Sequence, residues 1–257
     1  MDWQDSGIVL AVRPHGETSA IVEVLTETRG RHSGLVRGAH SRRLSPVLQP
    51  GNEVNVHWRG RLEEHLGTYQ VEPLRQRAAL VLDDPARLAG LASLAALAEI
   101  ALPEREPHGA LYRGFLVILD ALVEDGPWPA LIVRWEVQLL QELGFGLDLG
   151  SCAVTGLAED LTHVSPRTGR AVSRAAADPY ADRLLVLPPF LGGAARPGRG
   201  PDATPDEEDV AAGFALTGHF IERHVLGPRH LKMPPARSRL VSRFLVSPAT
   251  SGNLSPT

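Results

Sequence analysis

A change in hydrophobic periodicity near Leu74 constrains the fold of this chain more than any other feature of its sequence. Before that point, short apolar segments alternate with turn residues, and Val54, Val56 and Trp58 recur at every second position. A period of two is typical of a half-buried β-strand, and it assigns Trp58 to the core. Strands are predicted over residues 8–12, 20–25, 31–36, 52–58 and 66–71, with a short helical turn at 45–48. This pattern predicts a small β-barrel of the OB type, with an SH3-like barrel as the alternative.

Beyond Leu74 the apolar residues recur at helical spacing. Pro85 stands where proline suits the first position of a helix, and Leu88 and Leu91 begin the apolar stripe. Thr204 and Glu207 are expected to form a capping box at the start of a later helix. Helices are predicted over residues 85–103, 109–124, 129–143, 204–225 and 235–246. The predicted fold class is therefore α+β and multidomain, with the barrel followed by an α-helical domain.

Residues 145–200 are rich in turns and have the length and texture of a small zinc module. Structural zinc needs four Cys or His ligands, which arrive in closely spaced pairs. Cys152 is the one cysteine of the chain, Thr155 takes the place of its C-x-x-C partner, and His163 cannot replace the missing pair. We therefore expect no metal, and a segment held by apolar contacts. The predicted divisions are 1–76 for the barrel, 77–148 and 201–246 for the two parts of the helical domain, 149–200 for the insertion and 247–257 for a disordered tail.

Basic residues gather between Gly30 and Gly51, a segment that contains no acidic residue. The net charge of -4 at pH 7 is an average that hides this region. Guanidinium groups bind phosphate through paired donors and can stack on bases, so nucleic acid is the predicted partner and an ordinary solvated loop is the alternative. The residues predicted to bind DNA are Arg31, Arg37, His40, Ser41, Arg42, Arg43, Arg59 and Arg61.

A second basic group follows Asp209, after which Glu222 is the only acidic residue. These residues either extend the DNA track or pack the last helix against the core with their charged heads exposed. The predicted secondary DNA-binding residues are Arg229, Lys232, Arg237, Arg239 and Arg243.

Sequence motifs of common enzyme classes are missing. No G-x-x-x-x-G-K-[ST] loop, H-E-x-x-H or G-x-S-x-G occurs, and Gly144, Gly146 and Gly150 miss the dinucleotide fingerprint. The acidic residues at 83–84 and 206–209 suit helix N-termini, where the dipole favours negative charge. We expect a protein without enzymatic activity or cofactor. The polar first residues and the lack of a long apolar run predict a cytoplasmic protein without a membrane span.

Several segments, taken together, resemble the RecO family of bacterial recombination mediators. They are GRHSGLVRGAHSRR, LQPGNEV with the later WRGRLEEHLGTY, LQELGFGLDL, CAVTG, VSPRTGRAVS, LPPFL and LKMPPARSRLV, in the family's order over nearly the whole chain. The resemblance implies an OB-fold first domain, a helical second domain and an inserted zinc module. Many members keep four cysteines in that module, whereas only Cys152 is present here. The insertion is therefore expected to be a degenerate, zinc-ribbon-like module without zinc.

The same resemblance implies binding of single- and double-stranded DNA, annealing of complementary strands, and work with RecR. Together the two proteins would load the recombinase onto DNA coated with single-strand-binding protein, at the nucleoid. The acidic, hydrophobic C-terminal tail of single-strand-binding protein is expected to dock on the helical domain, where Arg113 and Arg134 are the candidate carboxylate partners. The alternative function is a basic protein-interaction scaffold that docks an acidic protein tail and contacts DNA incidentally.

Overall fold

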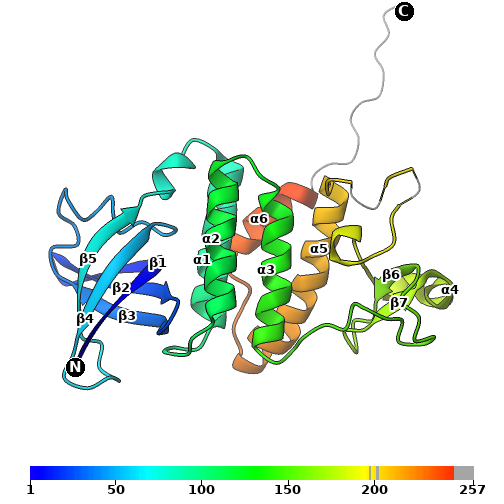
Figure 1. Cartoon of the computed structure of the whole chain (residues 1–257), viewed down its shortest axis with the longest axis horizontal. Coiled ribbons are helices and arrows are strands. Elements are labelled where there is room, and N and C mark those ends of the chain that lie inside the picture. Colours follow the sequence, from blue (N-terminus) through cyan, green and yellow to red (C-terminus); the bar gives the residue numbers. More distant parts are fainter. Residues whose placement is uncertain (197, 201–202, 246–257) are drawn as a thin grey trace, which may run out of the picture.

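The structure is a computed structural model and describes residues 1–196, 198–200 and 203–245. Three parts follow one another along the length of the molecule. A five-stranded barrel lies at one end, a group of helices in the middle and a small sheet at the other end (Figure 1). The tail predicted at 247–257 lies outside the described residues. Within the described part, no helix combines the length and the apolar character that crossing a bilayer requires.

The barrel closes in the strand order β1-β2-β3-β5-β4. Its first strand is long enough to pair with β4 from Asp2 to Ile8 and with β2 from Gly7 to His15, and the pairing with β2 contains a bulge between Val9 and Ala11. The strands are β1 (Asp2–His15), β2 (Ser19–Thr26), β3 (Gly30–Val36), β4 (Glu53–Arg59) and β5 (Thr68–Arg75).

Alternating side chains fill the inside of the barrel, as the period of two predicted. Val54, Val56 and Trp58 are buried on one face of β4. The Trp58 indole donates to the Leu66 carbonyl oxygen at 2.9 Å, so its one polar atom is satisfied and its place in the core is confirmed. Each predicted strand overlaps an observed one, but β1 and β5 extend further into polar sequence. Pairing with β4 holds the start of β1 and the end of β5, and pairing with β2 holds the end of β1. A hydrophobic pattern marks only the buried middle of a strand.

The segment between β3 and β4 crosses the barrel end as consecutive turns. The helical turn predicted at 45–48 is confirmed as a single turn, in which Leu48 N donates to Leu44 O at 2.9 Å. Leu44, Val47 and Leu48 are buried and anchor the segment to the barrel. Arg37, His40, Arg42 and Arg43 lie between the buried Val36 at the end of β3 and these anchors, so the loop that carries them is held at both ends.

The helices form the middle of the molecule. Pro85 is the first residue of α1, as predicted, and Asp84 caps that helix by accepting from Ala86 N at 2.8 Å. The predicted capping box of the later helix is wrong by two residues. Asp206 and Asp209 form it instead, each carboxylate accepting from the other's backbone N–H. The helices are α1 (Pro85–Ala101), α2 (Gly109–Val123), α3 (Trp128–Glu142), α4 (Arg174–Ala177), α5 (Glu207–Phe220) and α6 (Pro235–Leu245).

A three-stranded antiparallel sheet organises the stretch that the sequence suggested was irregular. Its order is β7-β6-β8, with β6 (Leu161–Val164), β7 (Ala171–Ser173) and β8 (Leu185–Val186). Val164, Val172 and Leu187 are buried, and they belong to the same apolar core as the helices. The barrel keeps a separate interior core, while Ile8 and Leu25 on its outer surface join the helical core.

Candidate nucleic-acid interface

A groove of about 540 Å³ opens on the barrel where β3 and β5 diverge. The two strands meet at one register position, Leu35 beside Thr68, and Leu35 N donates to Gly67 O at 3.1 Å. After Val36 the chain turns away, so the rest of β5 pairs with β4 alone. The sequence pattern did not indicate this groove, because it depends on how two strands separate in space.

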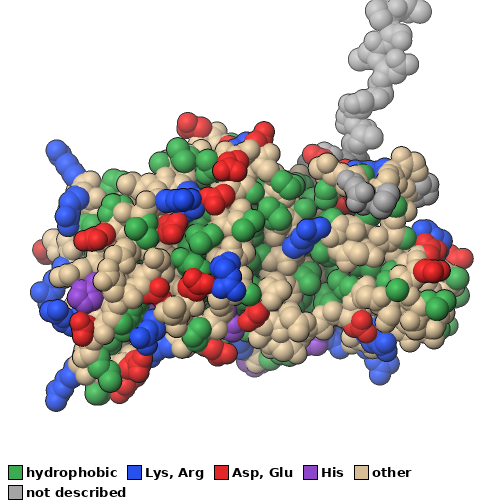
Figure 2. Space-filling view, in the orientation of Figure 1, with side chains coloured by type: hydrophobic (Ala, Val, Ile, Leu, Met, Phe, Trp, Pro, Cys, Tyr) green, Lys and Arg blue, Asp and Glu red, His purple; other side chains and the backbone are tan. Residues whose placement is uncertain are grey.

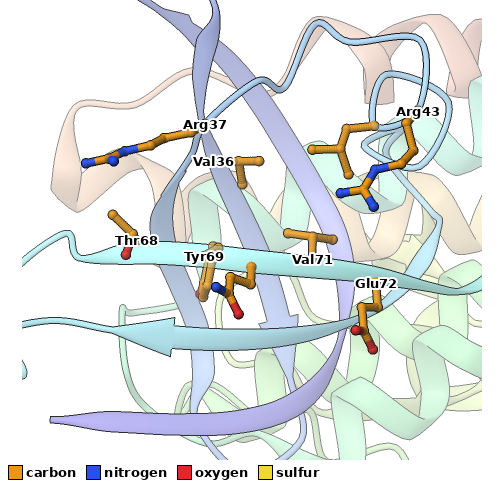
Figure 3. Close-up of a pocket in the computed structure, with 9 residues that line it drawn as sticks. Val36, Arg37, Arg43, Thr68, Tyr69, Val71 and Glu72 are labelled. Atoms are coloured by element: carbon orange, nitrogen blue, oxygen red, sulfur yellow. The ribbon is translucent and has the colours of Figure 1, made fainter.

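Arginines stand on one side of this groove and β5 forms the other. Figure 3 shows Arg37 and Arg43 on the segment that follows β3, with Thr68, Tyr69 and Val71 opposite them on β5. Glu72, also on β5, contributes the one carboxylate of the lining. The groove thus offers two guanidinium groups over a floor of mixed polar and apolar side chains.

Tyr69, which lines the groove on β5, packs in the barrel beside His32, and both side chains are buried. Tyr69 Oη lies 2.9 Å from His32 Nδ1. Burial raises the pKa of Tyr69 well above its ordinary value, whereas burial, with the positive charge of Arg105, lowers the pKa of His32 to about 4. Both side chains are therefore neutral at pH 7. Gly34 faces this pair so closely that an added Cβ would lie 2.4 Å from the Tyr69 ring.

Five of the predicted arginines are exposed and form no ion pair within the part of the chain that the structure describes. Arg37, Arg42 and Arg43 lie on the loop after β3, and Arg59 and Arg61 lie at the turn from β4 to β5. Basic side chains line this end of the molecule in Figure 2, on the side away from the helices. We call these five residues the outer arginines.

His40 and Ser41 lie on the same loop but in different surroundings. His40 lines a neighbouring hollow of about 280 Å³ together with Ser45 and Gln49. The Ser41 hydroxyl accepts from Leu44 N at 3.3 Å, so it already serves the turn. Both side chains are exposed and stand next to the outer arginines, without facing the groove between β3 and β5.

Arg31 was predicted to share the exposed basic surface, but its side chain is only 12% exposed. Its guanidinium lies 3.1 Å from the Glu23 carboxylate and donates to the Leu102 carbonyl oxygen at 2.9 Å. That carbonyl belongs to the end of α1, so Arg31 joins the barrel to the helices. Sequence proximity to the basic loop did not reveal this, because β3 turns Arg31 toward the opposite side.

The C-terminal basic residues also divide into two groups. Arg237 is buried and bonds to both oxygens of the buried Glu136, at 2.7 and 2.8 Å. Arg229 donates to the Ile100 carbonyl oxygen at 2.8 Å. In contrast, Lys232, Arg239 and Arg243 are exposed and have no ion pair among the described residues. Arg237 is therefore a packing residue and cannot contact DNA in this arrangement.

The two residues predicted to bind a protein tail lie on neighbouring helices but have different contacts. Arg113 on α2 pairs with Glu27 at 2.5 Å. Arg134 on α3 donates to the Phe190 carbonyl oxygen at 3.0 Å and lines an apolar hollow of about 280 Å³. Val117, Leu131 and Trp135 line the same hollow between α2 and α3. Only Arg134 of the two borders an apolar site.

The small sheet does not fit a zinc ion. Cys152 is buried, donates to Ser173 Oγ at 3.4 Å and accepts from Ser173 N at 3.3 Å. Across residues 1–196, 198–200 and 203–245, no group of three or more Cys, His, Asp or Glu side chains is arranged to hold a metal. The thiol has hydrogen-bond partners of its own and stands alone as a ligand.

Comparison with known proteins covers both halves of the chain. The model of "Recombination protein O N terminal" matches residues 1–77, and that of "Recombination protein O C terminal" matches residues 82–233. The chain is 52% identical to the DNA repair protein RecO of Rhodospirillum centenum, over 98% of each chain. It is 50% identical to the protein of that name in Phenylobacterium zucineum, over 95% of this chain and 98% of the relative. It is 49% identical to the DNA repair protein RecO of Rhizobium etli, over 100% of this chain and 98% of the relative.

Proposed function

The chain belongs to the RecO family of DNA repair and recombination proteins, and from that premise we propose that it is a non-enzymatic mediator that binds DNA through the outer arginines. Five exposed guanidinium groups without carboxylate partners, in the described part of the chain, carry this proposal. A carboxylate partner would neutralise an arginine and hold it in one geometry, whereas a free arginine can pair with phosphate.

The groove between β3 and β5 supports binding of single strands. Arg37 and Arg43 would hold the sugar-phosphate chain, and β5 would lie beneath the bases. The strand order and closure of the barrel agree with the OB type that we propose for it. Because few aromatic side chains line the groove, binding should be mainly electrostatic, with steep salt dependence and little sequence preference.

Annealing of complementary strands follows from the same electrostatics. Two strands whose phosphates are neutralised lose their mutual repulsion and can pair without a catalytic group. Arg42, Arg59 and Arg61 would extend the contact beyond the groove. Of the predicted secondary set we assign only the exposed Lys232 to DNA, since Arg239 and Arg243 border an apolar groove. Duplex DNA would use the same phosphate contacts.

We place the partner contacts on the helical part. The apolar hollow between α2 and α3, with Arg134 at its edge, suits the acidic and hydrophobic tail of single-strand-binding protein. Arg113 would need to leave Glu27 before it could bind a carboxylate. With RecR, the protein would load the recombinase onto DNA coated with single-strand-binding protein, at the nucleoid in the cytoplasm. In this proposal the small sheet is a degenerate zinc-ribbon-like module.

The same hollow supports a second candidate function, a scaffold that docks an acidic protein tail while DNA contact is incidental. The two functions differ in what the purified chain can do alone. A DNA mediator anneals oligonucleotides without a partner protein, and a scaffold does not.

Strand annealing with the isolated protein, at low and at moderate salt, tests the proposal. Arg42→Ala with Arg43→Ala should slow annealing and weaken DNA binding by about tenfold, because two phosphate contacts are lost. Arg167→Ala with Arg183→Ala is the matched control, since both residues are exposed and lie in the insertion. Equal annealing by the two double variants, or none by the unaltered chain, would contradict the DNA-binding proposal.

A further inference from the structure

A groove of about 550 Å³, apolar along its α1 side, runs between α1 and α6. The α1 side of this groove consists of Leu88, Ala89 and Ala92, which share one face of the helix because they are three, four and seven positions from Pro85. Leu88 is 38% exposed although it is a large apolar residue. Small alanines beside it allow another backbone to approach closely.

The α6 side of the groove carries charge. Arg239 and Arg243 line it and are four residues apart, so they lie one turn from each other on the same face. The neighbouring face of α6, about 100° around the helix, is fixed by Leu240, which is fully buried, and by Phe244, whose ring centroid lies 5.7 Å from that of Phe214. This packing holds the two arginines at the groove, where neither has an ion pair with another described residue.

We propose that the groove between α1 and α6 binds an amphipathic helix of a partner protein, with an apolar stripe seated on α1 and carboxylates on its flank paired with Arg239 and Arg243. The geometry favours a helix, because two packed helices present a groove into which the ridge of a third fits. We expect the partner helix to be acidic beside its apolar stripe, because two guanidinium groups border the apolar floor of the groove and would pair with carboxylates.

Nucleic acid fits this groove less well than a peptide does. The floor is aliphatic and offers no aromatic ring for base stacking. This site is independent of the outer arginines, so its test does not depend on the DNA-binding proposal.

The test uses the full chain and a labelled synthetic helix of about 18 residues, with leucine along one face and glutamates four residues apart beside it. Arg239→Glu with Arg243→Glu should weaken binding by about tenfold or more, and a peptide with lysine in place of glutamate should restore it. Ala92→Arg should also weaken binding, because the longer side chain fills the groove. Arg167→Glu with Arg183→Glu, which changes net charge equally at a distant site, should leave the affinity within about twofold.

Thermal unfolding of each variant keeps the result interpretable, since all the substituted positions are at least partly exposed and should melt like the unaltered chain. Equal binding by the α6 variant and its control, or failure of the lysine peptide to rescue, would overturn the proposal. Two other results would also overturn it. One is a loss of DNA affinity specific to the α6 variant, and the other is a dimer in solution that the α6 variant dissociates.

Discussion

Arginine side chains have opposite roles on the two sides of the barrel, the outer side away from the helices and the inner side that faces them. On the outer side, the outer arginines have no carboxylate partner within the described residues. On the inner side, toward the helices, Arg13, Arg31 and Arg77 each pair with at least one carboxylate. An arginine in this fold is therefore available for phosphate only where no acidic residue faces it.

The inner pairs join the barrel to the helices. Arg77 donates to Glu53 on β4 at 2.9 Å and to Asp120 on α2 at 2.8 Å, while its own side chain is 7% exposed. Arg13 pairs with Glu23 within the barrel and with Glu99 on α1. Because these groups are partly desolvated, removing one partner leaves a buried charge without compensation. We call Arg13, Arg31 and Arg77 the inner arginines.

The largest expected effect is on stability, from substitution of the most buried inner arginine. Arg77→Ala should lower the free energy of unfolding by about 3 kcal/mol, because Glu53 and Asp120 lose their shared cation. Denaturant unfolding measures the change, and DNA affinity measured well below the melting temperature should stay close to that of the unaltered chain. A loss of stability below about 1 kcal/mol would show that the inner pairs do not hold the two parts together.

Substituting two glycines that share a backbone conformation distinguishes the cost of losing close packing against the helices from the cost of backbone strain alone. Gly30 has φ +66°, and a Cβ there would lie 1.9 Å from the Glu106 carbonyl oxygen, next to the helices. Gly38, on the outer loop, has φ +65° and nothing within 4 Å of its Cβ position. Gly30→Ala should cost about 2 kcal/mol or more, and Gly38→Ala about 1 kcal/mol, as strain alone. Equal melting temperatures for the two variants would contradict the close inner packing.

Acid should destabilise the barrel through His32, which lies behind the groove wall. Burial lowers its pKa to about 4, against an ordinary value of 6.5, so the unfolded chain binds the proton more readily than the folded one. Stability is then full above pH 6.5 and falls as the pH drops toward 4, by about 2 kcal/mol after allowance for solvent screening. Unfolding of His32→Gln over the same pH range should have a shallower slope. An unchanged slope would remove His32 as the cause.

Local patterns predicted the parts of this fold that depend on neighbouring residues. The alternation of Val54, Val56 and Trp58 identified β4 and its buried face, and Pro85 identified the start of α1. The family resemblance is confirmed by both domain models and by relatives about 50% identical over nearly the full length. In contrast, β6 to β8 have at most four residues each, too few to establish a period.

Whether an arginine pairs with a carboxylate could not be predicted from the sequence, because the partner lies far along the chain. Arg237 and Glu136 are separated by 101 positions, and Arg77 and Asp120 by 43. A local charge count cannot find such pairs. The groove between β3 and β5 was missed for a related reason, since it forms where two strands separate after Leu35 and Thr68.

The salt dependence of DNA binding tests the contrast between outer and inner arginines most directly. In a plot of log affinity against log salt for single-stranded DNA, Arg37→Ala with Arg43→Ala should reduce the slope by about 1.4, because about 0.7 counterion is released per phosphate contact. The affinity should fall about tenfold with no change in melting temperature. Arg13→Ala, the inner control, should leave the slope unchanged. An unchanged slope for the outer variant, or an equal loss for Arg13→Ala, would contradict the account.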